Sequence, residues 1–287
     1  MPERLIRIGE LELWTEDFGD PADPAVLLNS GGGAPGILWS ESFCGALADA
    51  GRHVIRYDYR DVGLSSVVDF GANPYTISDL VTDAISVLDA YDAGAAHLVG
   101  WSQGGVIAQT AALEHPDRVA SVVSIASTPL RGAFHSGGDG ALGGPEPEFA
   151  EAGLAMIGAQ DDEERLDRYV DFMRVGCGTS FDEEQTRAFG AWALRRGRGP
   201  EGVMNHVMAM AATPECRDEL RRITAPTLVI HGTHDRVIPM PHGEATAAAI
   251  PGARLLVIEG MGHIPRPEPK EMLAAIVEHT VSVGAKR

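Results

Sequence analysis

The stretch Gly100-Trp101-Ser102-Gln103-Gly104 decides how the rest of the chain is interpreted. Residues 97–99 before it are apolar and typical of a buried strand, and residues 105–113 after it have helical periodicity. A Gly-x-Ser-x-Gly between a strand and a helix is typical of a nucleophile elbow. The turn is so tight that positions 100 and 104 must lack side chains. It exposes the serine hydroxyl above a sheet, beside the positive end of a helix dipole.

Strands and helices alternate on both sides of this turn. Helices are expected over residues 40–50, from Ser78-Asp79 onward, over 103–115, 243–249 and 271–281. Strands are expected over residues 4–9, 11–18, 25–29, 52–57, 95–101, 119–126, 227–231 and 254–259. This alternation predicts an α/β fold with a mostly parallel, eight-stranded sheet and helices on both faces.

One long segment interrupts the alternation. It begins with a stretch rich in Gly and Pro, about residues 130–150, and continues as charged helices to about residue 222. We expect residues 130–222 to form a helical cap, or lid, inserted over the strand ends, where open parallel sheets bind ligands. Residues 1–129 and 223–287 would then form the α/β core.

Composition and charge limit the partners. The chain has 23 basic and 41 acidic residues and a formal net charge of −18, which argues against a nucleic-acid or anionic-membrane surface. No apolar run reaches the roughly 18 residues that a membrane span needs. The start of the chain lacks the pattern of a signal peptide. We therefore expect a cytoplasmic monomer or homodimer that acts on a small molecule.

Neither the cysteines nor the one cluster of histidines predicts a metal site. The chain has three scattered cysteines and no CxxC pair, so we expect packed or half-exposed thiols at Cys44, Cys177 and Cys216. His231, His234 and Asp235 could be metal ligands, but a strand end followed by a loop would splay them. We expect neither a metal nor a cofactor.

An exposed serine needs a general base, and the base needs a group to orient it. Among ten histidines, His263 follows the strand at 254–259 through a short Gly-rich link, at the edge of the sheet where the elbow lies. Asp235 follows the strand at 227–231 at the same edge, although it could instead cap a turn. The chain order Ser102, Asp235, His263 is the one expected for a triad on this kind of sheet.

A tetrahedral intermediate carries a negative oxygen and needs two donors. The backbone N–H of Gln103, which opens the elbow helix, is one candidate. The other is Gly32 in the loop after the strand at 25–29, with Gly31 and Gly33 as alternatives.

Two further groups of residues permit two interpretations each. We interpret Asp58 and Arg60 as structural, pairing charges and fixing a turn, rather than catalytic. Met204 and Met208 recur at helical spacing in the cap, where they form either its own packed face or an apolar roof over a substrate.

With these residues assembled, the chain resembles the α/β-hydrolase superfamily. The motifs are Gly-Trp-Ser-Gln-Gly-Gly at 100–105, Asp-Tyr-Arg-Asp-Val-Gly-Leu-Ser at 58–65, His-Asp at 234–235 and Gly-Met-Gly-His at 260–263. The resemblance implies a serine hydrolase that needs no metal. Members usually carry His-Gly at the start of the oxyanion loop, where this chain has Ser30-Gly31.

More narrowly, the chain is similar to the aclacinomycin methylesterases, which remove a methyl ester from anthracycline polyketides. Similar stretches lie at 12–24, 53–58 and 240–243. The resemblance implies a carboxylic ester hydrolase acting on a small-molecule ester. The same fold also serves C–C bond hydrolases and lactonases, which stay open as alternatives. A non-catalytic ligand-binding protein is the rival from another class.

Overall fold

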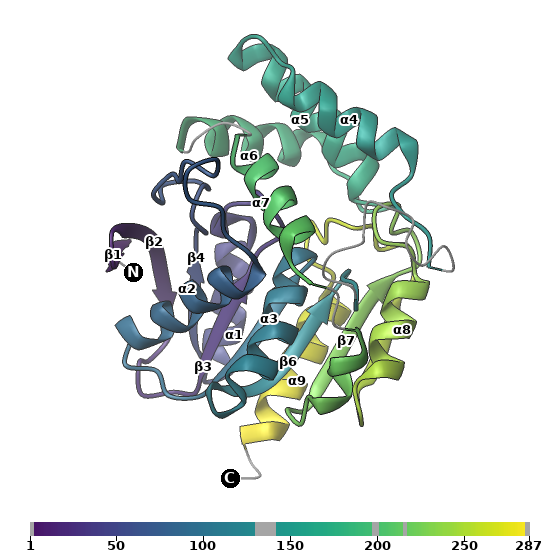
Figure 1. Ribbon diagram of the computed structural model, residues 1–287. Helices are drawn as coiled ribbons and strands as arrows, with labels where there is room; N and C mark the ends of the chain where they lie inside the picture. Colours follow the sequence, from purple (N-terminus) through teal and green to yellow (C-terminus); the bar gives the residue numbers. More distant parts are fainter. Residues whose placement is uncertain (1–2, 130–141, 197–200, 215–216, 285–287) are drawn as a thin grey trace.

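The computed structural model describes residues 3–129, 142–196, 201–214 and 217–284. Within these ranges the chain forms an eight-stranded sheet with helices on both faces, which confirms the predicted fold class (Figure 1). Cys44 and Cys177 are buried thiols, whereas Cys216 lies outside the described residues. No helix in these ranges is long and apolar enough to cross a membrane.

The sheet is antiparallel at one edge and parallel elsewhere. Its order is β1-β2-β4-β3-β5-β6-β7-β8, with β2 antiparallel to both β1 and β4 and all later pairs parallel. Strands β3 to β6 are buried along their whole length, as strands covered on both faces must be. The strands are β1 (Arg4–Ile8), β2 (Leu11–Phe18), β3 (Ala25–Asn29), β4 (His53–Tyr57), β5 (Ala96–Trp101), β6 (Val119–Ile125), β7 (Thr227–Gly232) and β8 (Arg254–Ile258).

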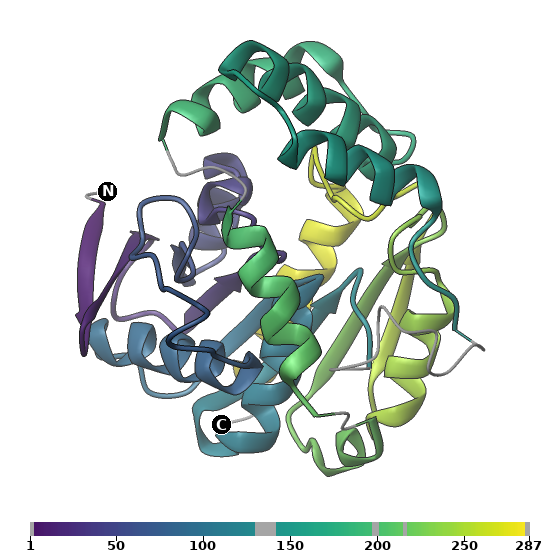
Figure 2. The ribbon, with the colours of Figure 1, turned by 45° about the horizontal axis from the view of Figure 1, so that its top comes forward.

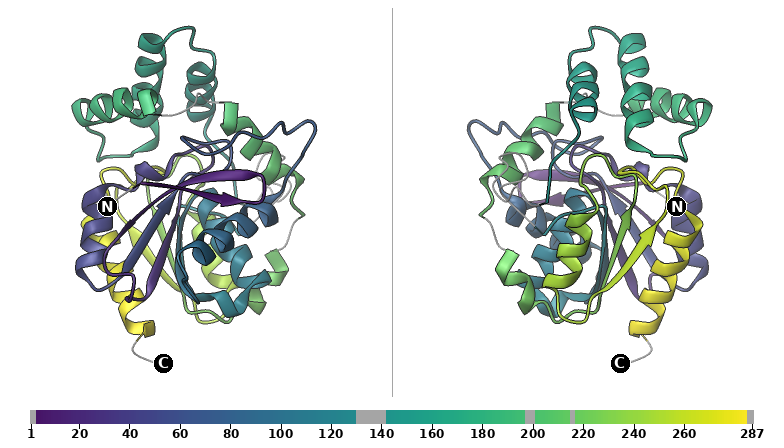
Figure 3. Two further views of the ribbon diagram at one scale, coloured as in Figure 1. Left: turned by 90° about the vertical axis from the view of Figure 1, so that its left-hand side faces the viewer. Right: turned by 90° about the vertical axis from the view of Figure 1, so that its right-hand side faces the viewer.

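Two sets of helices cover the sheet, and each packs into its own apolar cluster (Figure 3). One face carries α1 (Glu41–Asp49) and α9 (Lys270–Gly284). The other carries α2 (Ile77–Ala90), α3 (Gln103–Glu114) and α8 (Pro241–Ala249). Short 3₁₀ helices occur at η1 (Gly36–Leu38), η2 (Pro116–Arg118) and η3 (Arg217–Arg222).

Helix α2 begins earlier than its sequence suggests. The expected N-cap at Ser78 is wrong, because Thr76 closes a capping box instead. The Thr76 N–H and hydroxyl each donate to the Asp79 carboxylate at 2.8 Å, so Asp79 is the third residue of the helix rather than its start.

Four helices lie beyond the carboxyl ends of the strands (Figures 1 and 2). They are α4 (Pro147–Ile157), α5 (Asp162–Gly176), α6 (Glu183–Arg196) and α7 (Glu201–Ala212). Helices α4 to α6 pack on one another, whereas Ala209 of α7 is buried in the apolar cluster of α2 and α3. The Ile77 N–H also donates to the Thr213 hydroxyl just after α7, at 3.0 Å. Helix α7 is therefore anchored to the α/β core.

Candidate active site

Ser102 lies at the tight turn between β5 and α3. Its φ of 55° and ψ of −121° fall in a region that residues with a side chain rarely adopt. The Ser102 N–H donates to Ile125 O at 2.8 Å, and the Ser127 hydroxyl donates to Ser102 O at 2.7 Å. A Cβ at Gly100 would lie 2.0 Å from the carbonyl oxygen of Gly104, so the close approach of strand and helix requires glycine there.

His263, in the segment after β8, reaches the hydroxyl of Ser102. The distance from His263 Nε2 to Ser102 Oγ is 3.0 Å. The Trp101 indole N–H donates to the backbone carbonyl of His263 at 2.6 Å. Phe149 of α4 lies edge-on to the imidazole, with ring centroids 6.2 Å apart. Trp101 and Phe149 thus both contact His263, which is buried.

Asp235, just after β7, orients the imidazole of His263. Its Oδ2 lies 3.0 Å from His263 Nδ1, while its Oδ1 accepts the N–H groups of Val237 and Ile238 at 2.9 and 2.8 Å. Burial raises the pKa of the Asp235 carboxyl, but the imidazoles of His263 and His231 together lower it by more, to well below its usual value. The ionised carboxylate favours the tautomer of His263 that keeps its proton on Nδ1 and turns the Nε2 lone pair toward Ser102.

A second histidine contacts the same carboxylate. His231 Nε2 lies 2.7 Å from Ile238 O and 3.3 Å from Asp235 Oδ2, and the side chain is fully buried. His234, the other ligand considered for a metal, is exposed and contacts the Thr233 hydroxyl. Over the described ranges, no group of three His, Cys, Asp or Glu side chains is arranged to hold a metal ion.

The two expected oxyanion donors lie on segments that touch each other. Gln103 is the first residue of α3, and a Cβ added to Gly32 would lie 2.7 Å from Gln103 Oε1. The N–H of Gly33, an alternative donor, is already used, because it donates to His206 Nδ1 at 2.9 Å. Within the described part of the chain, neither the Gly32 N–H nor the Gln103 N–H donates to a turn or loop carbonyl, and their role as oxyanion donors stays a prediction.

His206 of α7 is a contact of this site that the sequence analysis does not identify. It is buried, and its Nε2 lies 3.0 Å from Arg60 O. Its own backbone carbonyl accepts the side-chain amide of Gln103 at 3.2 Å. The only signal in the sequence is weak: Gly202 and Ala209 flank His206 at helical spacing, which indicates a buried helix face but not what it contacts.

The burial of His206 predicts acid sensitivity. Burial lowers the pKa of the imidazole from 6.5 to about 4, against smaller raising effects of the Arg60 carbonyl and Asp61. The unfolded chain therefore binds more protons between these pH values, and the free energy of unfolding should fall as the pH decreases from about 6.5 to about 4. The titration of this one group should lower the free energy of unfolding by roughly 3 kcal/mol over that pH range.

Urea unfolding between pH 7 and pH 4.5 tests this expectation. The His206→Asn variant, which lacks the titrating group, should lose less stability over this range than the wild type. The exposed His234 provides the control, since His234→Asn should leave the pH dependence unchanged. Equal slopes for the wild type and His206→Asn would contradict the assignment.

Asp58 and Arg60 have the structural roles that their sequence predicts. The Asp58 carboxylate accepts the N–H groups of Gly36 and Leu64 at 2.7 and 3.0 Å. Arg60 forms a two-bond ion pair with Asp83, each bond 2.7 Å long. Asp58 thereby joins the loop after β4 to the loop that follows β3.

The two methionines of α7 lie away from the core. Met204 and Met208 are 45% and 40% exposed, whereas Gly202, His206 and Ala209 on the same helix are buried. The interpretation that the methionines form a packed face of the cap is therefore wrong. Their contact with an apolar ligand stays a prediction.

The chain belongs to the α/β-hydrolase family: the family described as "alpha/beta hydrolase fold" matches residues 24–268. It is 39% identical to the rhodomycin D methylesterase DauP of Streptomyces sp. (strain C5) and 37% identical to the rhodomycin D methylesterase DnrP of Streptomyces peucetius. Each of these two matches covers 98% of this chain and 98% of the relative.

A solved structure supports the same family. A hydrolase from Pseudomonas aeruginosa PA01 superimposes with a TM-score of 0.72 and 27% sequence identity, over 98% of this chain and 97% of that one. Together the comparisons confirm the predicted α/β-hydrolase fold and the predicted class of carboxylic ester hydrolases.

Proposed function

We propose that the chain hydrolyses a carboxylic ester through an acyl-enzyme, with Ser102 as nucleophile, His263 as general base and Asp235 as its orienting group. The observation that carries this proposal is the continuous relay from Ser102 Oγ through His263 to Asp235 Oδ2, with 3.0 Å at each link. Both distances are within the range for a hydrogen bond and for proton transfer.

Each step uses a group already described. His263 Nε2 takes the hydroxyl proton while Ser102 Oγ attacks the ester carbonyl. The N–H groups of Gly32 and Gln103 hold the oxyanion, next to the positive end of α3. The tetrahedral intermediate collapses, the bond to the alkoxy group breaks, and the alcohol leaves with the proton from His263. Water then attacks the acyl-enzyme, His263 accepts its proton, and the acid departs as Ser102 regains its hydrogen.

The helical segment 130–222 is proposed to act as a cap over this site, with residues 1–129 and 223–287 as the core. Support comes from the position of α4 to α7 beyond the strand ends and from the contact of Phe149 with the imidazole of His263 (Figure 2). Exposed apolar side chains on these helices favour a bulky apolar ligand; they are Leu154, Ile157, Trp192, Met204 and Met208.

The proposed substrate is the methyl ester of a polycyclic aromatic polyketide. Two relatives that cover 98% of the chain, at 39% and 37% identity, are named rhodomycin D methylesterases. We expect kcat/KM for rhodomycin D to exceed that for methyl benzoate by at least about 10-fold. That ratio corresponds to about 1.4 kcal/mol, the gain from burying about two extra methylene groups.

A substrate panel tests the proposal. Rhodomycin D, methyl benzoate, a lactone and a β-diketone are incubated with the protein, and the acid products and methanol are measured by mass spectrometry and gas chromatography. We expect the methyl ester to release methanol and the acid in equal amounts. Turnover of the diketone alone would favour a C–C bond hydrolase, and turnover of the lactone alone a lactonase. Either result would overturn the esterase proposal.

A further inference from the structure

We propose that His206 of α7 is a positioning residue for the oxyanion hole. Its imidazole fixes the loop that carries Gly32, and its backbone carbonyl fixes the side chain of Gln103. The inference rests on the proposed function, because it takes the N–H groups of Gly32 and Gln103 as the oxyanion donors. It goes further by giving a helix outside the sheet control over the position of both donors.

The loop after β3 is held directly by the first turns of α7. The Gly33 N–H donates to His206 Nδ1 at 2.9 Å. This N–H belongs to the peptide plane that starts at the Gly32 carbonyl, so the bond fixes the ψ angle of Gly32. Gly33 has a φ of +70°, and a Cβ there would lie 2.4 Å from Val203 Cγ2. The close approach of helix and loop therefore depends on glycine at position 33.

The imidazole of His206 is itself held in one orientation. Its Nε2 lies 3.0 Å from Arg60 O, a carbonyl that can only accept, so Nε2 carries the proton and Nδ1 is the acceptor for the Gly33 N–H. The rings of Tyr59 and Tyr75 pack against the imidazole, with centroids 5.6 and 6.2 Å away. The residue is 1% exposed, so its ring has no freedom to turn toward solvent.

The second donor segment is attached through the backbone of the same residue. The Gln103 side-chain amide donates to His206 O at 3.2 Å, and the side chain of Gln103 is buried beside Gly32. One residue of α7 therefore contacts both segments that supply the oxyanion donors. Because oxyanion donors act only when they lie within about 0.5 Å of the productive position, these two contacts bear on the rate.

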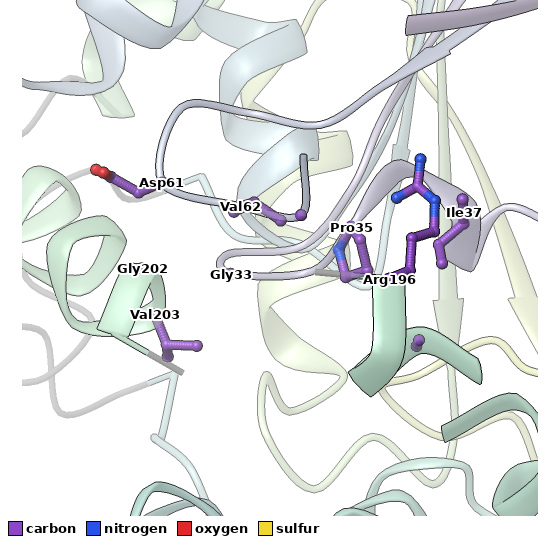
Figure 4. A pocket seen from close by; sticks show the side chains of 10 residues that line it. Gly33, Pro35, Ile37, Asp61, Val62, Arg196, Gly202 and Val203 are labelled. Carbon is purple, nitrogen blue, oxygen red and sulfur yellow. The ribbon is translucent and has the colours of Figure 1, made fainter. Parts of the chain in front are cut away.

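The junction between α7 and the loop is too small to be a substrate site. Figure 4 shows a cavity lined by Gly33, Pro35, Val62, Gly202 and Val203, among others. Its volume is about 40 Å³, against roughly 300 Å³ or more for a pocket that holds a small molecule. His206 is not among the residues that line this cavity.

Two substitutions separate the two imidazole bonds. In His206→Asn, the side-chain oxygen lies where Nδ1 was and still accepts the Gly33 N–H, but the bond to Arg60 O is lost. In His206→Gln, the amide reaches Arg60 O, and the bond to Gly33 is lost.

The measurements are kcat and KM for a methyl ester and the Kd of phenylboronic acid. The tetrahedral adduct of phenylboronic acid with Ser102 places an oxygen in the oxyanion hole. His206→Gln should lower kcat about 10- to 100-fold and raise the Kd of phenylboronic acid by a similar factor. KM should change less than about threefold. His206→Asn should keep both values within about fivefold of the wild type.

Asn205→Ala is the matched control. The Asn205 side chain also anchors α7, because its amide donates to Asp61 Oδ2 at 3.1 Å and to Val68 O at 3.4 Å, and neither of these bonds is to the loop that carries Gly32. This variant should lose thermal stability and keep the Kd of phenylboronic acid. Equal losses in the Asn and Gln variants, or an unchanged Kd in His206→Gln, would overturn the inference. Failure of the wild type to hydrolyse esters would instead overturn the proposed function.

Discussion

The Ser102→Ala variant should hydrolyse the methyl ester about 10⁴- to 10⁶-fold more slowly than the wild type, in kcat. The Oγ atom of Ser102 forms the bond of the acyl-enzyme. The alanine side chain carries no nucleophile that could replace it. Stability should change little, because the hydrogen bond described for Ser102 Oγ is the one to His263. The rate that remains would come from the oxyanion donors and substrate binding alone.

Steady-state kinetics and labelling with a fluorophosphonate check this prediction. The wild type should lose activity as the probe attaches to one serine, and Ser102→Ala should not be labelled. Ser86, whose hydroxyl donates to Thr82 O on α2, a helix that carries none of the proposed catalytic residues, is the control. The Ser86→Ala variant should keep both its turnover and its labelling. Turnover near the wild-type value in Ser102→Ala, or labelling of that variant, would defeat the proposed mechanism.

The Asp235→Asn variant should lower kcat by about 10⁴-fold while the chain stays folded. The two N–H groups of Val237 and Ile238 point at Oδ1, so the oxygen of the new amide must stay there. The amide nitrogen then faces His263 and donates to Nδ1. The imidazole proton moves to Nε2, which points at Ser102, and His263 can no longer accept the hydroxyl proton.

A second buried Asp–His pair provides the control for this substitution. Asp17 Oδ2 lies 3.0 Å from His53 Nε2, and both side chains are buried between β2 and β4. Asp17→Asn should reduce thermal stability but leave kcat within about threefold of the wild type. A loss smaller than tenfold in Asp235→Asn, with a normal melting temperature, would show that Asp235 does not set the tautomer of His263.

The proximity of the three residues of the proposed triad could be predicted from the sequence because the topology of the sheet brings them together. Ser102, Asp235 and His263 each follow a strand that runs in the same direction, so their side chains emerge at the same edge. The strand boundaries were also well defined, since buried parallel strands are short apolar runs bounded by turn residues, as at 25–29.

The contacts made by α7 could not be predicted in the same way. His206 bonds to Gly33, which lies 173 positions earlier in the chain, and no local pattern indicates such a partner. The exposure of Met204 and Met208 was missed for a related reason. A helix with apolar residues on several sides does not indicate which side packs, and the small residues Gly202 and Ala209 allowed the opposite face to approach the core.

The bond from the Trp101 indole to the backbone of His263 has a consequence for the mechanical behaviour of the site. Strands β5 and β8, which lead to these two residues, are three places apart in the sheet, about 14 Å across. Without a direct tie, any change in sheet twist would be multiplied over that span and would alter the gap between hydroxyl and imidazole. The segment after β8 returns to the end of β5, where His263 Nε2 lies 3.0 Å from Ser102 Oγ and the indole bond joins the two segments. Ser102 and His263 should therefore move together as the sheet flexes.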